Sequence, residues 1–233
     1  MSGRLAGRRG ASAPLFLAAA VPTKSRNFRI ALSGATGTGK TTLARALADA
    51  LGLPLIAEDL VAVVEARRVF LTAARESSAG LPAARDAYLA AADAWLHDRE
   101  AWRTALPGFV ADRWGIDLLT ALVSSGLGPA HDKRVAGWIA QCQRYARHLD
   151  LIVMPPLVRF TDEPRNEFGL PRASALGPRV VDHCLIRGLI EQFVPTPRLY
   201  LPDSVRSVEA RVEHVRKVLE RLPPRRVVSD VQA

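Results

Sequence analysis

Eight residues near the N-terminus have the types and spacing needed to bind phosphate. Residues 34–41 read GATGTGKT and satisfy the pattern G-x-x-x-x-G-K-[ST]. In such a loop backbone N–H groups approach phosphate oxygens closely, and a Cβ on the glycines would hinder or strain that approach. Lys40 is expected to reach the β- and γ-phosphates, and the Thr41 hydroxyl to bind Mg²⁺. The residues predicted to contact ATP are Gly34, Ala35, Thr36, Gly37, Thr38, Gly39, Lys40, Thr41 and Thr42.

The segments on either side of this loop fit the same interpretation. Residues 29–33 form a short apolar run typical of a buried strand, and Leu43, Leu47 and Leu51 recur at helical spacing after the loop. A helix beginning near Gly39 would direct the positive end of its dipole at the phosphates. The sequence thus has the order strand, loop and helix that the motif requires.

Acidic residues follow the next two apolar segments. Glu58 and Asp59 come directly after residues 53–57, and Asp112 closes residues 108–112. Carboxyl ends of parallel strands meet at one edge of an open α/β sheet, so these side chains should face the active crevice. One of the two, Glu58 in preference to Asp59, is predicted to accept a proton from, or hydrogen-bond to, an acceptor hydroxyl. The alternative is a cap for the following helix, because Asp59 stands directly before the helical pattern that begins at Leu60.

Asp112 and Arg113 form a second candidate pair, in the pattern of a Walker B acid. Asp112 is expected to hold the Mg²⁺ shell, usually through water, and Arg113 to neutralise phosphate charge or hold the acceptor. The alternative for Asp112 is again a helix cap. Asp117, about one turn into the next predicted helix, is a further candidate.

Two predicted helices over residues 60–104, joined by a turn at 77–82, form an insertion expected to cover the acceptor site. Aromatic residues on these helices are predicted to belong to the core rather than to stack on a ligand ring, and their arginines to be solvated rather than to bind an anion. The residues concerned are Tyr88, Trp95, Trp102, Arg67, Arg68, Arg99 and Arg103.

The later part of the chain supplies two more strands, a lid and a closing helix. Residues 151–154 and 198–201 are predicted strands, and residues 207–222 an amphipathic helix. Between them, the irregular segment 158–179 suits a mobile lid that excludes water and brings guanidinium groups onto the transferring phosphoryl, although a solvated loop is the alternative. Its arginines are Arg159, Arg165, Arg172 and Arg179, of which Arg165 is the predicted finger. By topology alone, residues 202–205 are the predicted adenine site.

Composition supports one phosphate-binding domain in a chain of 233 residues. The net charge of +9 lies partly in residues 1–26, which contain five basic and no acidic residues. We expect 1–26 to be a disordered basic extension rather than a signal or transit peptide, 27–222 to be the ATP-binding domain, and 223–233 to be a disordered tail. Cys142 and Cys184 fit no metal or redox spacing, and no apolar run has the length of a membrane span. These features predict a cytoplasmic protein, with nucleic acid an improbable partner.

The motifs GATGTGKTTLARAL and FVADRWGIDLLTAL together resemble those of P-loop nucleoside and nucleotide kinases. In particular, residues 28–222 resemble the AAA-type ATPase domain family related to the ribosylnicotinamide kinase domain of the bacterial NAD-biosynthesis regulator. The resemblance matches Glu58 to the acid closing strand two, and Asp112 with Arg113 to the pair closing strand three. The segment DLIVMPPLVRFTDEPRNE resembles the fourth strand and lid, which implies Arg165 as a phosphate contact.

The resemblance implies an α/β fold, the P-loop NTPase three-layer sandwich. Its five-stranded parallel sheet would have helices on both faces, with ATP and Mg²⁺ bound at the strand C-termini and an arginine-bearing lid. One departure is the absence of the arginine that often follows the strand-two glutamate, since residues 59–61 read DLV. The identity of the acceptor is therefore not carried over.

Three functions remain open on the sequence. The first is transfer of the ATP γ-phosphoryl to a hydroxyl or phosphate of a small nucleoside- or nucleotide-like acceptor. The second is an ATP-hydrolysing switch or regulatory ATPase that acts on a protein partner, although no small helical domain follows the fifth predicted strand. The third, an ATP-using nucleic-acid-binding protein, is favoured only by the basic ends.

Overall fold

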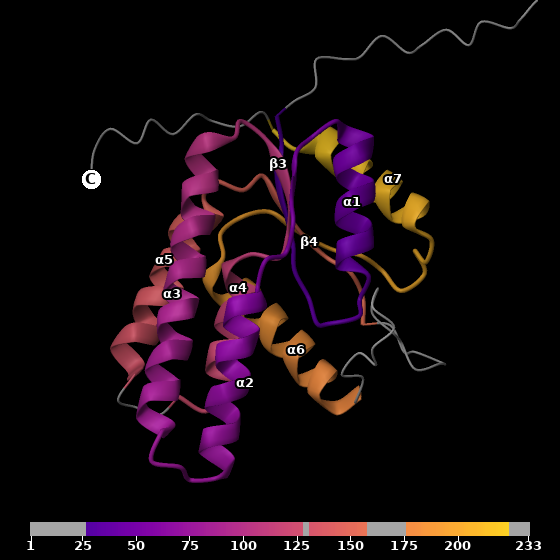
Figure 1. The fold of residues 1–233 in the computed structure, drawn as a ribbon. Coiled ribbons are helices and arrows are strands. Elements are labelled where there is room, and N and C mark those ends of the chain that lie inside the picture. Colours follow the sequence, from indigo (N-terminus) through magenta and orange to yellow (C-terminus); the bar gives the residue numbers. More distant parts are fainter. Residues whose placement is uncertain (1–26, 128–130, 158–175, 224–233) are drawn as a thin grey trace, which may run out of the picture.

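A sheet of five parallel strands forms the centre of the fold (Figure 1). The computed structural model describes residues 27–127, 131–157 and 176–223. Within them the strand order is β2-β3-β1-β4-β5. The strands are β1 (Arg29–Leu32), β2 (Leu55–Ile56), β3 (Phe109–Asp112), β4 (Leu151–Met154) and β5 (Arg198–Tyr200). The predicted α/β three-layer architecture is confirmed, while residues 1–26 and most of the predicted lid and tail lie outside the described residues.

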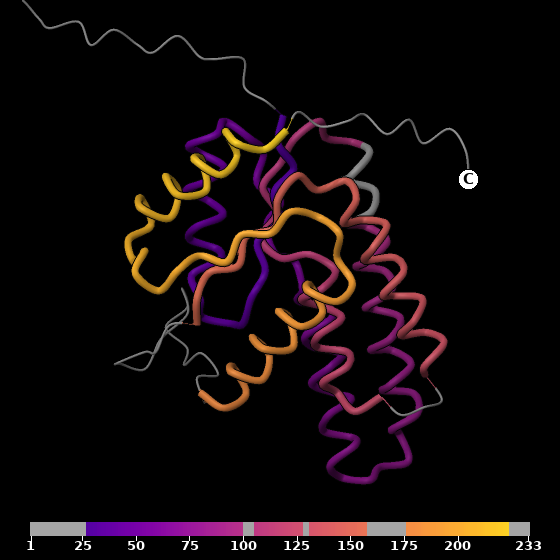
Figure 2. Tube along the Cα trace, turned by 180° about the vertical axis from the view of Figure 1, so that it is seen from behind, coloured from indigo at the N-terminus to yellow at the C-terminus, as the bar shows by residue number. Residues whose placement is uncertain are grey.

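Helices cover both faces of this sheet. Figure 1 shows α1 and α7 together on one face and the others on the opposite face, and the reverse view in Figure 2 agrees. The helices are α1 (Lys40–Leu51), α2 (Val61–Arg75), α3 (Leu81–Ala105), α4 (Gly115–Val123), α5 (Asp132–Ala146), α6 (Leu176–Phe193) and α7 (Val208–Arg221). Of the helices that the structure describes, none combines the length and apolarity that crossing a bilayer demands.

Strand side chains divide the hydrophobic core into two clusters. Ile30 and Leu32 of β1 pack with residues of α1 and α7, whereas Ala31 joins the cluster beneath the other helices. In β4, Val153 and Ile152 separate in the same way. Successive side chains of a strand point to opposite faces, so strands buried on both faces must be apolar almost throughout.

The order of strands places β1 between β3 and β4. Leu32 at the end of β1 lies beside Asp112 on one side and Val153 on the other. From β1 the chain first builds the β3 side of the sheet and later crosses to the β4 side, which creates a switch in direction at β1. In open α/β sheets, the crevice at such a switch is where ligands bind, and it lies at the phosphate loop.

Two predicted boundaries differ from the structure. The second strand was expected over residues 53–57 but comprises only Leu55–Ile56, because this edge strand pairs solely with β3. Helix α6 begins at Leu176, so the end of the predicted lid segment is helical. Pro178 does not prevent this because proline is tolerated in the first helical turn, where its missing N–H has no partner.

The start of α4 is closely packed, and this yields a test of the fold. A Cβ at Gly115 would lie 2.7 Å from Cys142 Sγ and 3.2 Å from Leu96 Cδ2. We expect Gly115→Ala to lower the free energy of unfolding by about 1–3 kcal/mol through overpacking. Gly137→Ala, in α5 with open space around it, should be neutral or stabilising. Urea unfolding of both variants measures the contrast, and equal stabilities would contradict the packing described.

Candidate active site

The phosphate loop connects β1 to α1 through a backbone that only glycine adopts readily. Gly34, Gly37 and Gly39 have φ angles of 139°, 78° and 82°, where a side chain would be strained. Gly39 caps α1 without a side-chain hydrogen bond, and the first turn has no acidic residue. The first N–H groups of α1 thus have no side-chain acceptor at the cap, and with the helix dipole they favour an anion.

Lys40 is buried beneath this loop, 4% exposed. Its Nζ donates a hydrogen bond of 2.8 Å to the Ala35 carbonyl oxygen. Burial, and secondly the Arg113 guanidinium, lower the pKa of Lys40 to about 7, although nearby carboxylates oppose the shift. A polyanionic ligand would therefore restore the full charge of this lysine.

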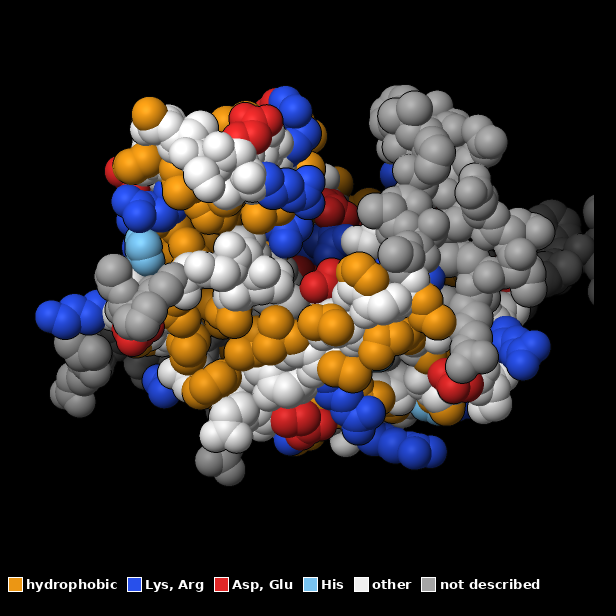
Figure 3. Space-filling view, turned by 90° about the horizontal axis from the view of Figure 1, so that it is seen from below, with side chains coloured by type: hydrophobic (Ala, Val, Ile, Leu, Met, Phe, Trp, Pro, Cys, Tyr) orange, Lys and Arg blue, Asp and Glu red, His pale blue; other side chains and the backbone are white. Residues whose placement is uncertain are grey.

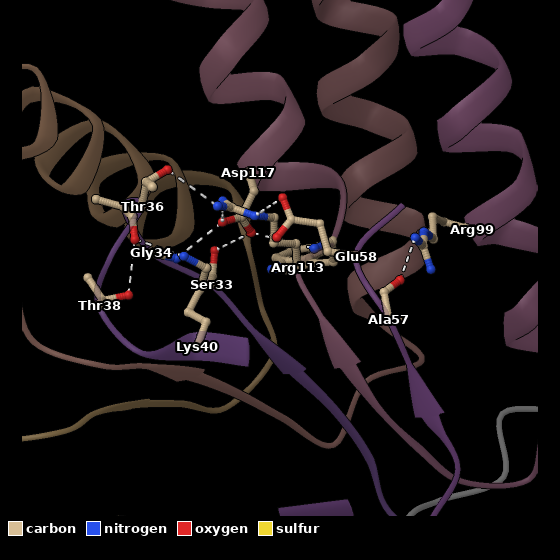
Figure 4. Close-up of polar contacts among 12 residues, drawn as sticks. Ser33, Gly34, Thr36, Thr38, Lys40, Ala57, Glu58, Arg99, Arg113 and Asp117 are labelled. Atoms are coloured by element: carbon tan, nitrogen blue, oxygen red, sulfur yellow. Dashed lines mark hydrogen bonds and ion pairs between the residues drawn. The ribbon is translucent and has the colours of Figure 1, made fainter. Parts of the chain in front are cut away.

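Asp117 anchors the beginning of the loop from α4. Its carboxylate accepts hydrogen bonds from Ser33 Oγ (2.8 Å) and from the Gly34 backbone N–H (3.2 Å) (Figure 4). It also accepts a longer bond of 3.5 Å from the backbone N–H of Trp114, the residue that caps α4. One buried carboxylate thus fixes both the phosphate loop and the start of α4.

Arg113 joins this anchor to the acid that follows β2. Its Nε lies 2.6 Å from Glu58 Oε1, and Nη1 lies 3.2 Å from Asp117 Oδ1. Its Nη2 reaches the hydroxyl of Thr36 at 3.5 Å. Burial by itself would lower the pKa of Arg113, but the carboxylates of Asp117 and Glu58 outweigh burial and raise it. Arg113 is a non-glycine residue with a positive φ angle of 75°. The turn after β3 therefore directs the Arg113 side chain into the site through a strained backbone conformation.

The two residues predicted to bind metal lie together. Burial raises the pKa of Asp112, whereas a hydrogen bond with Thr41 opposes that rise. Asp112 Oδ1 is buried and has no hydrogen-bond partner among the described residues. A carboxylate and a hydroxyl at the end of a phosphate loop are oxygen donors suited to Mg²⁺, which binds few protein ligands beside substrate phosphates. The cap alternative for Asp112 is wrong, since α4 is capped by Trp114.

Two further arginines donate hydrogen bonds to carbonyl oxygens of the loop: Arg179, one of the four arginines of the predicted lid segment, and Arg211, which the sequence analysis did not single out. Arg179 of α6 donates from Nε to the Thr36 carbonyl oxygen at 2.9 Å, so it contacts the loop itself. Arg211 of α7 donates from Nη1 to the Thr38 carbonyl oxygen (3.3 Å) and from Nε to that of Val205 (3.0 Å). Arg211 therefore links the loop to the turn predicted as the adenine site. The position of Arg211 within an amphipathic helix gave no signal in the sequence that its side chain contacts the loop.

A cavity of about 180 Å³ opens beside the loop on the face covered by α2, α4 and α6. Seen from below, charged side chains gather in a hollow bordered by hydrophobic groups (Figure 3). Phosphate-loop residues, Glu58 and Arg113 line one part, and α2, α4 and α6 supply the rest. Its lining comprises Gly34, Ala35, Thr36, Glu58, Leu60, Val63, Val64, Arg67, Arg113, Asp117, Leu118, Thr120, Ala121, Ser124, Asp182 and Ile186.

The other candidates on the helical insertion have mostly structural positions. Tyr88 stacks on Phe70 at 5.8 Å between ring centroids, and Trp95 packs under the Arg99 guanidinium, so both aromatics belong to the core as predicted. Arg99 is not solvated as expected but buried, with Nη2 bonded to the Ala57 carbonyl oxygen. Arg68 forms an exposed ion pair, whereas Arg67 faces the cavity.

Several predicted side chains lie outside the described residues. They are those of Arg159, Arg165, Arg172, Trp102 and Arg103. The helix-cap alternative for Glu58 and Asp59 is wrong, because α2 begins at Val61 without a side-chain cap.

The parallel sheet and the phosphate loop between β1 and α1 define a P-loop α/β fold. A family model described as AAA domain matches residues 29–189, more than half of the chain, and the protein belongs to that family. None of the curated proteins compared with the chain matches it.

Similar solved structures include a deoxyadenosine kinase from M. mycoides with bound dCTP. Its TM-score is 0.57 at 12% identity, over 83% of this chain and 99% of that chain. A thymidylate kinase from Candida albicans gives a TM-score of 0.54 at 14% identity, over 84% of this chain and 92% of that chain. At such identities the similarity establishes the fold.

The anchoring role of Asp117 is testable by replacing it with its amide. Asp117→Asn removes the charge that faces Arg113 and places an NH₂ group opposite hydrogen-bond donors. We expect stability to fall by about 3 kcal/mol and nucleotide affinity by about tenfold or more. Asp49→Asn, an exposed change on α1, is the control. Thermal unfolding and nucleotide titration measure both effects, and unchanged affinity would show that Asp117 does not shape the loop for binding.

The lowered pKa of Lys40 predicts that nucleotide binding takes up a proton. Above its pKa of about 7 the free lysine is largely neutral, and bound phosphates raise that pKa. From about pH 8 to about pH 9, affinity should therefore fall as pH rises, by at most about tenfold per unit. Calorimetry in two buffers of different ionisation enthalpy measures the uptake. Lys40→Gln should show none, and equal uptake in that variant would assign the proton elsewhere.

Proposed function

We propose that the protein is a phosphotransferase that moves the γ-phosphoryl of ATP, with Mg²⁺, to a small nucleoside- or nucleotide-like acceptor. The observation that carries this proposal is the shared wall between two sites. Gly34, Ala35 and Thr36 belong to the phosphate loop and also line the adjacent cavity, together with Glu58 and Arg113. An acceptor in the cavity would therefore lie next to the triphosphate, and holding two reactants together is a large part of phosphoryl-transfer catalysis.

The nucleotide side of the site would act by position and charge. The N–H groups of the loop and the Lys40 ammonium would hold the phosphates, and Thr41 with Asp112 would hold Mg²⁺. A bound Mg²⁺ neutralises charge that develops on the phosphoryl oxygens. Since little covalent chemistry falls to the protein in this reaction, these contacts would supply most of the rate enhancement.

On the acceptor side, Glu58 is the proposed proton acceptor. Its side chain is 32% exposed and lines the cavity, and its ion pair with Arg113 fixes its direction. Arg113 is held between two carboxylates and reaches the loop at Thr36, so it is suited to orient Glu58 and the acceptor together. From the sequence resemblance we further propose Arg165 as a lid contact to the transferring phosphoryl, and kinship with the ribosylnicotinamide kinase domain.

The solved kinases named above support this proposal through their shared fold. One is a deoxyadenosine kinase and the other a thymidylate kinase. Because the first is named for a nucleoside and the second for a nucleotide, they favour neither acceptor class. Hydrolysis of ATP coupled to a protein partner, the alternative from the sequence, would appear in the assay below as acceptor-independent turnover.

The experiment is ATP consumption measured with a panel of nucleosides, nucleotides and vitamin-like ribosides, beside an acceptor-free control. We expect turnover to depend on both an acceptor and Mg²⁺, with Lys40→Ala folded but inactive. Asp112→Asn should lower Mg²⁺-dependent transfer by about 100-fold or more, while Mg²⁺-free nucleotide binding changes by less than about threefold. The exposed Asp49→Asn should match the unaltered protein. Equal loss of transfer and metal-free binding, with reduced stability, would remove Asp112 from the metal site.

A further inference from the structure

Building on the proposed transferase function, we propose that the acceptor is a hydroxyl compound that carries no phosphate of its own. Its flat heterocyclic part would lie between α2 and α6, with its polar edge at Arg67 and Asp182. The cavity geometry, its charge and the contacts of Arg67 carry this inference.

The cavity has aliphatic walls that suit a flat ring. Leu60 before α2, Val63 and Val64 of α2, Leu118 of α4 and Ile186 of α6 line it. Apolar walls with a few placed polar groups are typical of such sites, and the polar groups determine orientation.

On both α2 and α6, a charged residue lies four positions from an aliphatic residue of the cavity lining. Arg67 lies four residues after Val63 on α2, and Asp182 lies four residues before Ile186 on α6. Residues four apart share a helix face, and all four line the cavity. The guanidinium offers donors and the carboxylate offers acceptors, so an edge with both an acceptor and a donor, as in an amide or aminoheterocycle, would be satisfied.

Neighbouring side chains hold Arg67 in place. Its Nε donates to Ser125 Oγ at 3.1 Å, and the Tyr88 hydroxyl lies 3.4 Å from the same oxygen. Asp182, Arg67 and Arg113 line the same cavity. Burial raises the pKa of the Asp182 carboxyl group, and the charges of Arg67 and Arg113 oppose this rise. The contacts of Ser125 with Arg67 and Tyr88 therefore connect α2, α3 and the turn after α4, and Asp182 of α6 lines the same cavity as Arg67.

The charge of the lining opposes an acceptor that bears phosphate. Two guanidinium groups, of Arg67 and Arg113, face the three carboxyl groups of Glu58, Asp117 and Asp182. Arg113 is already paired with two of them. Even with Asp182 protonated, the described lining residues would have no surplus positive charge for a monophosphate dianion, and burying a charge without a partner is costly.

The other cations near the loop point to the nucleotide side. Lys40 and Arg179 donate to the carbonyl oxygens of Ala35 and Thr36, and neither belongs to the cavity lining. Their charges would meet the triphosphate first. An uncharged or cationic hydroxyl acceptor is therefore the chemistry that the described lining fits.

The first test compares nucleosides with their own 5′-monophosphates as acceptors for ATP and Mg²⁺. We expect kcat/KM to be at least about 100-fold higher for nucleosides, a difference of about 2.7 kcal/mol. A preference for monophosphates would overturn this inference and leave the proposed kinase function intact. Acceptor-independent hydrolysis with neither class used would instead reject the kinase function, and this inference with it.

The second test locates recognition at the polar end. Asp182→Asn and Arg67→Gln should each raise KM for the best nucleoside about tenfold and leave kcat within about twofold, because these groups bind the acceptor and not the transferring phosphoryl. Asp86→Asn, an exposed change on α3, is the control, and melting temperatures check folding. If neither folded variant alters KM, or if kcat alone falls, the polar edge does not lie at this pair.

Discussion

The site depends on one buried carboxylate, that of Asp117. It holds the start of the phosphate loop through Ser33 and Gly34, and it pairs with Arg113, which also forms an ion pair with Glu58. A buried charge is tolerable only when it is paired and hydrogen-bonded, and each of these groups supplies a partner for another. The loop before α1, the turn after β3 and the acid after β2 are therefore fixed as one unit. Moving any of them would leave a charge unpaired in the interior.

The carbonyl oxygens of the phosphate loop are stabilised by cations from three helices. Lys40 at the start of α1 donates a hydrogen bond to the carbonyl oxygen of Ala35. Arg179 of α6 donates to the carbonyl oxygen of Thr36, and Arg211 of α7 to the carbonyl oxygen of Thr38. A phosphate approaching the loop needs N–H groups and positive charge, whereas exposed carbonyl oxygens would repel it. Engaging these oxygens from outside thus favours an anion, and it ties the loop to both faces of the sheet.

The sheet also separates the two halves of the proposed reaction. The face with α1 and α7 carries the Arg211 contact and the predicted adenine turn, while the face with α2, α4 and α6 contains the cavity. Both meet at the carboxyl end of β1, where the strand order changes direction. Substitutions at the polar end of the cavity, at residues such as Arg67 and Asp182, would accordingly leave the phosphate loop unaltered. This separation is consistent with one fold serving different acceptors.

The sequence alone determined most of the helices and strands and the position of the phosphate loop, because those signals are local. Glycines at fixed spacing before Lys40, an apolar strand and a helical repeat are readable along the chain, and so was the acid closing β3. Tertiary structure alone decided which distant side chains meet. Asp117 reaches Ser33 only because β3 lies beside β1, and Arg211 reaches Thr38 only because α7 packs near α1. Arg67 of α2 and Asp182 of α6 line one cavity only because the fold brings these two helices to the same site. Such contacts depend on strand order and helix packing, for which neither composition nor periodicity carries a signal.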